Sequence, residues 1–192
     1  MEIENWFSTP IYYHHLEDPI LSKCQQEISS SVDNLSTSQL GSPWEDTVET
    51  TFSYKDENNF LISAPTLRSE ILNHSAIFAK NLELEFNDIH LTESWLNITK
   101  KGGFQHYHNH IPYDISAIYY HKTSGNDGNT VFKDPALIKT TSKLLGKLPR
   151  TVRYKPREGT IILFPSFLEH CVYHNETENA RISIACNLNI DI

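Results

Sequence analysis

The sequence predicts a mainly β protein with helices: a double-stranded β-helix, or jelly roll, with N-terminal helices packed on one sheet. Two helical patterns occupy the first ninety residues, whereas short β-type runs separated by turns fill the rest of the 192-residue chain. No repeat or low-complexity linker divides the sequence. Helices that precede many short strands are typical of a helical layer on a double sheet. We therefore expect a single domain over 1–192, in which 1–90 form a helical support with a few strands and 91–192 form the jelly-roll core.

The first half should contain a strand over 7–16, a helix over 18–32, a strand over 46–55 and a helix over 63–86. The first helix is indicated by Asp18 as N-cap and by Pro19 at the first helical position. The second has Pro65 at its start, and the apolar residues of each helix fall on one face. These inner faces comprise Ile20, Leu21, Cys24, Ile28 and Val32 in the first helix, and Leu67, Ile71, Phe78 and Leu82 in the second.

From about residue 90 the sequence alternates between β-type runs and turn signals. The turns are marked by KKGG, SGNDGN, REG and HNETEN. The expected strands lie within 91–100, 104–110, 114–121, 130–135, 151–156, 159–165, 170–174 and 181–190. This many short strands indicates a β-sandwich or barrel, which is the basis for the jelly-roll prediction.

The composition argues against several kinds of partner and compartment. The formal net charge is −8 and the cationic residues are scattered, so no nucleic-acid partner is expected. No segment approaches the apolar length of a transmembrane helix, and the N-terminal residues do not resemble a signal peptide. Cys24, Cys171 and Cys186 form no close pair, which indicates a reducing compartment. We expect a cytoplasmic protein without a membrane partner, and the sequence is compatible with a homodimer.

The stretch GGFQHYHNH places His106, His108 and His110 at alternate positions. In an extended strand these side chains point to one side, which is a poor pattern for a packed core and a good one for a metal site. His170 follows the apolar run 160–164, on a strand that a jelly roll returns beside the histidine series. Two histidines from one strand and one from a later strand occupy three positions around a metal and leave others open.

Over residues 93–190 the sequence resembles the Fe(II)- and 2-oxoglutarate-dependent oxygenases, near the prolyl 4-hydroxylases and their uncharacterised bacterial and phage relatives. The resemblance rests on HNH followed by SAIYYH, GNTVFKDP, PREGTIILFPSFLEH and RISIACN. It implies a dioxygenase that uses Fe(II), 2-oxoglutarate and dioxygen, with His108 and His170 as metal ligands. It also implies that Arg181, with Ser183 two residues later, binds the far carboxylate of 2-oxoglutarate.

The third metal ligand departs from the family pattern. The family motif is His-x-Asp, whereas this sequence has His110 in place of the aspartate. We predict His110 as the third ligand, with Asp114 as the alternative. Asp114 would either reach the metal or orient His110 through a hydrogen bond. His106 shares the strand face but lies one step too early for this motif.

Arg181 is also supported by its own chemistry. It starts an alternating apolar strand, where a guanidinium can bind a carboxylate through two parallel N–H donors, and Ser183 shares its face. The other expected contacts to the co-substrate are Asn97, Gln105 and Tyr119. Asn97 has apolar neighbours on both sides, which is unusual for an amide without a partner. The alternatives are a core amide bonded to backbone for Asn97 and a surface salt bridge for Arg181.

Three functions remain open from the sequence. The first is a 2-oxoglutarate-dependent hydroxylase that acts on a peptidyl residue, an amino acid or a small metabolite, in a cavity lined by Trp95, Tyr107, Tyr119 and Phe164. The second is a cupin-like isomerase, lyase or sensor without 2-oxoglutarate, in which the same three histidines bind Mn, Zn or Ni. The third is a jelly-roll binding module with incidental histidines. Arg181 separates the first two, because 2-oxoglutarate needs a cationic partner; Arg153 and Lys155 are the alternative anchors.

Overall fold

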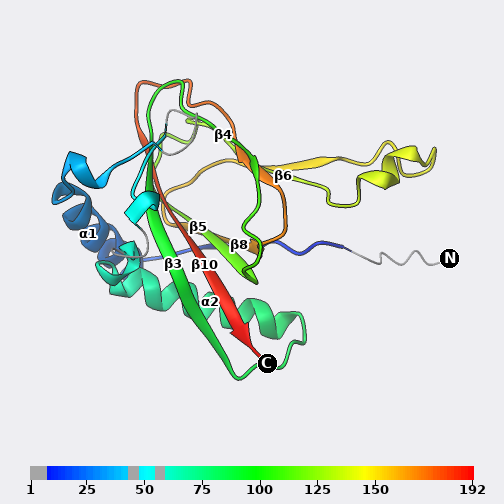
Figure 1. The fold of residues 1–192 in the computed structure, drawn as a ribbon, viewed down its shortest axis with the longest axis horizontal. Helices are drawn as coiled ribbons and strands as arrows, with labels where there is room; N and C mark the ends of the chain where they lie inside the picture. Colours follow the sequence, from blue (N-terminus) through cyan, green and yellow to red (C-terminus); the bar gives the residue numbers. More distant parts are fainter. Residues whose placement is uncertain (1–7, 43–47, 55–58) are drawn as a thin grey trace.

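The computed structural model describes residues 8–42, 48–54 and 59–192, which form two antiparallel β-sheets with helices on one side (Figure 1). The larger sheet has the strand order β1-β8-β5-β10-β3-β2, and the smaller sheet has the order β4-β9-β6-β7. Strands far apart in the sequence are thus neighbours in both sheets, as in a double-stranded β-helix. The predicted fold class is confirmed.

The larger sheet combines strands from both halves of the chain. Its strands are β1 (Tyr12–His15), β2 (Val48–Thr50), β3 (Asp88–Thr99), β5 (Ile115–Lys122), β8 (Thr160–Pro165) and β10 (Arg181–Asp191). The smaller sheet consists of β4 (Gln105–His108), β6 (Thr130–Lys133), β7 (Thr151–Tyr154) and β9 (His170–Val172). The α-helices are α1 (Ile20–Asp33) and α2 (Pro65–Asn81), and short 3-10 helices cover 37–39, 52–54, 60–62 and 137–141. β1 and β2 lie at the edges of the larger sheet, and β10 lies between β5 and β3.

Both α-helices pack on the outer face of the larger sheet (Figure 1). The main cluster of buried apolar side chains joins Ile28 of α1 and Ile71 of α2 to Ile184 and Leu188 of β10. Each aliphatic side chain buried in this way contributes about 1.5–3 kcal/mol to folding. Because side chains alternate along a strand, the odd-numbered residues of β10 from Arg181 onward face the smaller sheet instead.

The helices differ from the prediction at their ends. Asp18 is not the N-cap: α1 begins two residues after it, and its Oδ1 accepts a hydrogen bond of 3.1 Å from the backbone N of Ser22. The second helix is shorter than 63–86 because Glu83 has a φ of 58°, a left-handed conformation that helical residues do not adopt. Leu82 is 51% exposed and so does not belong to the inner face.

The two strands expected in the first half are also shorter than predicted. The strand over 46–55 is reduced to β2, because the chain then turns into a 3-10 helix, and the Oγ1 of Thr50 accepts a bond of 3.1 Å from the backbone N of Phe52. Residues 46, 47 and 55 of that prediction lie outside the described residues. The strand over 7–16 corresponds to β1, which begins after Pro10; residue 7 is not described.

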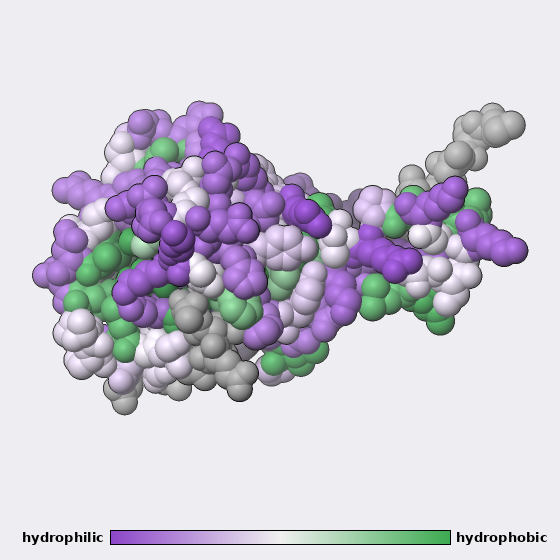
Figure 2. Space-filling view, turned by 90° about the horizontal axis from the view of Figure 1, so that it is seen from above, coloured by the Kyte–Doolittle hydropathy of each residue, from purple (hydrophilic) through white to green (hydrophobic). Residues whose placement is uncertain are grey.

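A segment between β6 and β7 projects away from the two sheets (Figure 1, yellow). It covers residues 134–150, to which the sequence analysis assigned no element beyond Pro135. Apolar and polar side chains both face outward on it (Figure 2), and Leu144 is 86% exposed. The segment therefore adds little to the core and does not contribute to the cavity between the sheets.

Candidate metal centre

A cavity of about 730 Å³ lies between the two sheets. The larger sheet supplies its floor through residues of β3, β5 and β10, and β4 with the segment that follows it forms the opposite wall. Trp95, Tyr107 and Phe164 line the cavity, as expected from the sequence. The side chains that bear on function are grouped at three places along this cavity: a histidine cluster, a buried cation and a buried carboxylate.

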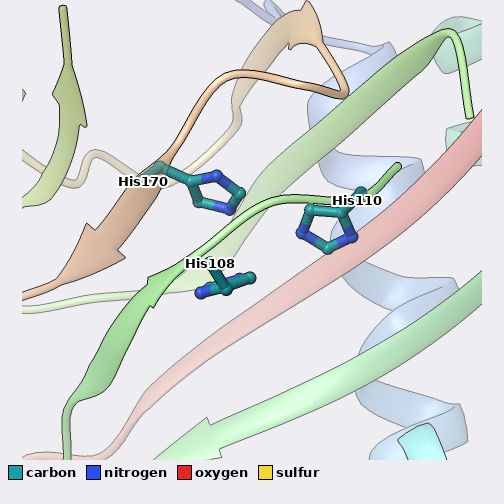
Figure 3. Close-up of side chains that lie close together, drawn as sticks. All are labelled: His108, His110 and His170. Carbon is teal, nitrogen blue, oxygen red and sulfur yellow. The ribbon is translucent and has the colours of Figure 1, made fainter. Parts of the chain in front are cut away.

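His108, His110 and His170 come together in this cavity (Figure 3). One potential ligand atom from each of these residues lies within 4.8 Å of the other two. β4 pairs with β9 in antiparallel register, which places His108 directly opposite His170. His110 lies two residues beyond β4, where its backbone N donates a hydrogen bond of 2.8 Å to the carbonyl of Ser166. The predicted histidines from two separate segments thus face one point.

Backbone carbonyls orient two of these rings. The Nδ1 of His108 lies 2.7 Å from the carbonyl oxygen of His106, and the Nδ1 of His170 lies 3.0 Å from that of Leu168. A carbonyl only accepts, so each Nδ1 is the protonated donor and the ring's lone pair resides on Nε2. Burial lowers the pKa of His170 well below its ordinary value, and the nearby His108 and His110 lower it further. His170 is therefore neutral, the form in which imidazole binds a metal.

The ring of His110 is held by an aromatic contact. It stacks on Trp95 of β3 with ring centroids 5.6 Å apart and an angle of 21° between the planes. Trp95 in turn contacts the edge of Phe52 at a centroid distance of 5.0 Å. Offset aromatic stacking of this kind fixes ring orientation as well as burying apolar area. His110 thus follows β4, at the edge of the smaller sheet, but its ring is oriented by Trp95 of the larger sheet.

Asp114 does not join the cluster. Its Oδ2 accepts a hydrogen bond of 2.9 Å from the backbone N of Ile190, and its backbone N donates to the carbonyl of Leu188 at 3.1 Å. These bonds attach the segment before β5 to the end of β10. Among the described residues, the group of potential ligands at this point comprises histidines only. His106 lines the cavity but is not part of that group.

Arg181 is a buried cation in the same cavity. It is 2% exposed, and it donates hydrogen bonds to the carbonyls of Gly128 at 2.8 Å and Asp127 at 3.2 Å, and to the Oγ1 of Thr99 at 3.1 Å. Burial lowers the pKa of Arg181, an effect that Tyr120 and Asp127 oppose. Within the described part of the chain, its Nε has no hydrogen-bond partner and no carboxylate lies within ion-pair distance.

The other predicted co-substrate residues divide into two sets. Asn97 and Ser183 oppose each other across β3 and β10, both are buried, and Asn97 Oδ1 has no partner among the described residues. They line the cavity, as does Gln105 of β4. Tyr119 does not, because it points into the core under the helices; this assignment was wrong. Its neighbour Tyr120 lines the cavity instead, with its hydroxyl 2.6 Å from the Oγ1 of Thr130.

A third polar group in the cavity was missed from the sequence. Glu93 of β3 is 4% exposed, and its Oε1 accepts a hydrogen bond of 2.7 Å from the Nδ2 of Asn187. Ser116 extends this network by donating to the Oδ1 of Asn187 at 2.8 Å. Strand alternation could have revealed Glu93, because it lies four residues before Asn97 and therefore on the same face.

Three histidines, a buried guanidinium and a polar cavity within a jelly roll are suited to binding a metal ion together with an anionic organic molecule. The family described as "Putative 2OG-Fe(II) oxygenase" matches residues 93–187, which include all three histidines and the buried cation. Residues 93–187 therefore belong to the Fe(II)- and 2-oxoglutarate-dependent oxygenase superfamily, whose cofactors are Fe(II) and 2-oxoglutarate. No curated protein matched the chain in sequence.

Solved structures share this fold at low sequence identity. A Pseudomonas putida prolyl-4-hydroxylase matches with a TM-score of 0.65 and 12% identity, over 95% of this chain and 93% of that chain. HygX from Streptomyces hygroscopicus, with nickel and 2-oxoglutarate bound, gives a TM-score of 0.63 and 12% identity over 94% and 83% of the two chains. The epimerase SnoN from nogalamycin biosynthesis gives 0.67 and 13% over 94% and 77%. Since these proteins include an epimerase, the shared fold does not select one reaction.

The donor set of this chain fits both cofactors. Neutral imidazoles are suitable ligands for Fe(II). The buried Arg181, with an unpartnered Nε beside the cavity, fits a carboxylate of 2-oxoglutarate, since a buried cation is stable only when paired. The described helices include none that is long and apolar enough to cross a lipid bilayer.

Proposed function

We propose that the protein is an Fe(II)- and 2-oxoglutarate-dependent dioxygenase that hydroxylates a peptidyl residue, an amino acid or a small metabolite. His108, His110 and His170 bind the iron, which makes this an all-histidine ligand set. Arg181 binds the far carboxylate of 2-oxoglutarate, assisted by the hydroxyl of Ser183 and the amides of Asn97 and Gln105. The observation that carries the proposal is a buried cation without a described carboxylate partner in the cavity that holds the histidines.

Each part of the cavity has a separate task in this proposal. Bound Fe(II) and 2-oxoglutarate supply dioxygen activation coupled to decarboxylation of the co-substrate to succinate. The protein holds the ligand rings in place through the carbonyls of His106 and Leu168 and through the stack on Trp95. The hydrogen bonds from Arg181 to Gly128, Asp127 and Thr99 fix the guanidinium before the co-substrate arrives, so little ordering remains to be done on binding.

The first ninety residues serve as the support of this site. α1 and α2 cover the outer face of the larger sheet, and so the inner face remains available for polar residues. Buried apolar contacts with the helices on one face of β3, β5 and β10 thus stabilise these strands. The other face of the same strands lines the cavity. In this proposal, residues 1–90 support the site and residues 91–192 carry it.

The test is an anaerobic titration of the Fe(II)-loaded protein with 2-oxoglutarate, followed by the metal-to-ligand charge-transfer absorbance. Wild type should develop the band at or below millimolar 2-oxoglutarate, and succinate should form once dioxygen and a substrate are added. His108→Ala and His170→Ala should each lose iron in elemental analysis, whereas His174→Ala, an exposed histidine outside the histidine cluster, should not. Absence of the band in iron-loaded wild type would favour the cupin-like alternative.

A further inference from the structure

Glu93 places a buried carboxylate on the floor of the same cavity as the histidine cluster. Carboxylates are rarely this buried in proteins, because removing the charge from water costs several kcal/mol unless other groups stabilise it. The Glu93 side chain lies on the strand face that also carries Trp95 and Asn97, and it opposes Asn187 across β3 and β10. Its position is therefore set by the centre of the larger sheet and not by a surface loop.

The register of the two strands separates Glu93 from the co-substrate anchor. Arg181 opposes Thr99 at one end of the β3–β10 ladder, and Asn187 opposes Glu93 six residues further along both strands. Six residues of extended strand span about 20 Å. Trp95, which stacks on the ligand His110, lies one pleat from Glu93 and two pleats from Thr99. Along the strands, Trp95 and the His110 ring stacked on it thus lie nearer to Glu93 than to the position of Arg181.

A directed chain of hydrogen bonds holds this carboxylate. The Ser116 hydroxyl donates to Asn187 Oδ1 at 2.8 Å, and Asn187 Nδ2 donates to Glu93 Oε1 at 2.7 Å. Because Ser116 has only one hydroxyl proton, the Ser166 hydroxyl 2.8 Å away must donate to it. Every donor in this series of hydrogen bonds points toward Glu93, which holds the Glu93 side chain in place as an acceptor. Ser166 also receives the backbone hydrogen bond of His110, so the network is attached to the metal-ligand segment.

We propose that Glu93 binds a protonated amine or guanidinium group of the substrate; this rests on the proposed function, in which 2-oxoglutarate occupies the Arg181 end. A cationic group near Glu93 gains a charge-assisted hydrogen bond in a partly desolvated cavity, whereas an anionic group there is repelled. The aromatic faces of Trp95 and Phe52 line the same part of the cavity and favour the alkyl stem and charge of such a group. The substrate class is therefore a cationic amine, either free or on a lysine or arginine side chain.

The test of the Glu93 site measures the binding of matched probes. The protein is loaded with Ni(II) and 2-oxoglutarate, a form that does not turn over. The probes are n-butylammonium and n-butylguanidinium against n-butanol, with N-acetyl-lysine amide against N-acetyl-norleucine amide. Dissociation constants come from calorimetry or ligand-observed NMR. In wild type each cation should bind at least about 30-fold more tightly than its neutral partner, which corresponds to about 2 kcal/mol for a desolvated charge pair.

Glu93→Gln should remove this preference while leaving the fold intact, because its side-chain oxygen can still accept from Asn187. The matched control is Glu85→Gln, an exposed glutamate outside the cavity, which should keep the wild-type preference. The proposal is overturned if wild type binds no cationic probe, if it binds neutral probes equally well, or if Glu93→Gln retains the preference.

The iron–2-oxoglutarate absorbance band separates this result from the proposed function. Glu93→Gln should form the band with wild-type affinity for 2-oxoglutarate, because the anchor at Arg181 is unchanged. If wild type forms the band but shows no preference for cations, the substrate assignment fails and the oxygenase assignment stands. If the band is absent but Glu93-dependent cation binding is present in the metal-loaded protein, the binding site stands and the oxygenase assignment fails.

Discussion

Replacement of Arg181 by methionine is the sharpest test of the co-substrate site, because it removes the charge and keeps most of the stem volume. A buried carboxylate that loses its cationic partner should bind about 2–5 kcal/mol more weakly. That range corresponds to at least a roughly 30-fold higher dissociation constant for 2-oxoglutarate. Iron binding should stay near the wild-type level, since Arg181 contacts none of the three histidines through a hydrogen bond in the described structure.

The same replacement has a structural cost that can be worked from the contacts. Arg181→Met removes three hydrogen bonds, to Gly128, Asp127 and Thr99, each worth about 1 kcal/mol. A loss of about 3 kcal/mol should lower the melting temperature by roughly 6–12 °C in a domain of this size. Titrations should therefore be run well below the variant's own melting temperature, with circular dichroism to confirm that it is folded.

Two further variants complete the experiment. Arg181→Lys keeps a positive charge without the fork of donors and should recover part of the affinity for 2-oxoglutarate. Arg153→Met is the matched control, because Arg153 is an exposed arginine that contacts the ring of Tyr173 and does not line the cavity. The assay is the charge-transfer absorbance during anaerobic titration. A folded, iron-loaded Arg181→Met that titrates like wild type would refute the reasoning and place the anchor elsewhere.

Three other outcomes follow from the site and its surroundings. Iron should be absent from anaerobically reconstituted His170→Ala, since one of three ligands is lost; full occupancy by elemental analysis would contradict the ligand set. His110→Ala should also lose iron, whereas Asp114→Ala should keep it. Asp114→Ala should lose about 1 kcal/mol of folding stability, because the hydrogen bond from Ile190 is removed. Loss of iron in Asp114→Ala but not in His110→Ala would make Asp114 the ligand. Burial lowers the pKa of both His74 and His121 to about 4, so the unfolded chain takes up protons between pH 6.5 and 4 that the folded chain does not. Stability should be complete above pH 6.5 and fall by about 2 kcal/mol per histidine at pH 5; equal free energies of unfolding in urea at both pH values would refute this.

The sequence predicted the residues whose neighbours are determined by strand geometry. The HNH spacing and the returning strand at His170 both depend on two-residue periodicity and antiparallel pairing, and the structure brings these histidines together. Arg181 was also predictable, because a cation at the start of an alternating apolar strand must face one side of it. The placement of helices on one sheet followed from their apolar stripes.

The errors arose where a single residue decides the face or the end of an element. Tyr119 and Tyr120 are adjacent aromatic residues, and β5 has a register irregularity opposite Ile182 and Ser183, so the sequence does not reveal which tyrosine faces the cavity. Glu93 was missed because a glutamate in a strand is more often solvated than buried. The end of the second helix was mispredicted because Glu83 adopts a left-handed conformation, which a sequence normally signals with a glycine.

The strand at the centre of the larger sheet is also the last strand in the sequence. β10 pairs with β3 on one side and β5 on the other, and in the described sheet it alone joins the β2–β3 pair to β5, β8 and β1. Without residues 181–191, the described larger sheet would divide into two ribbons, β2–β3 and β5–β8–β1, each with an open edge. β10 completes the larger sheet, and it also supplies Arg181 and Asn187 to the cavity. A polypeptide halted before residue 181 should therefore be retained by chaperones or degraded, and should not survive as a smaller folded protein.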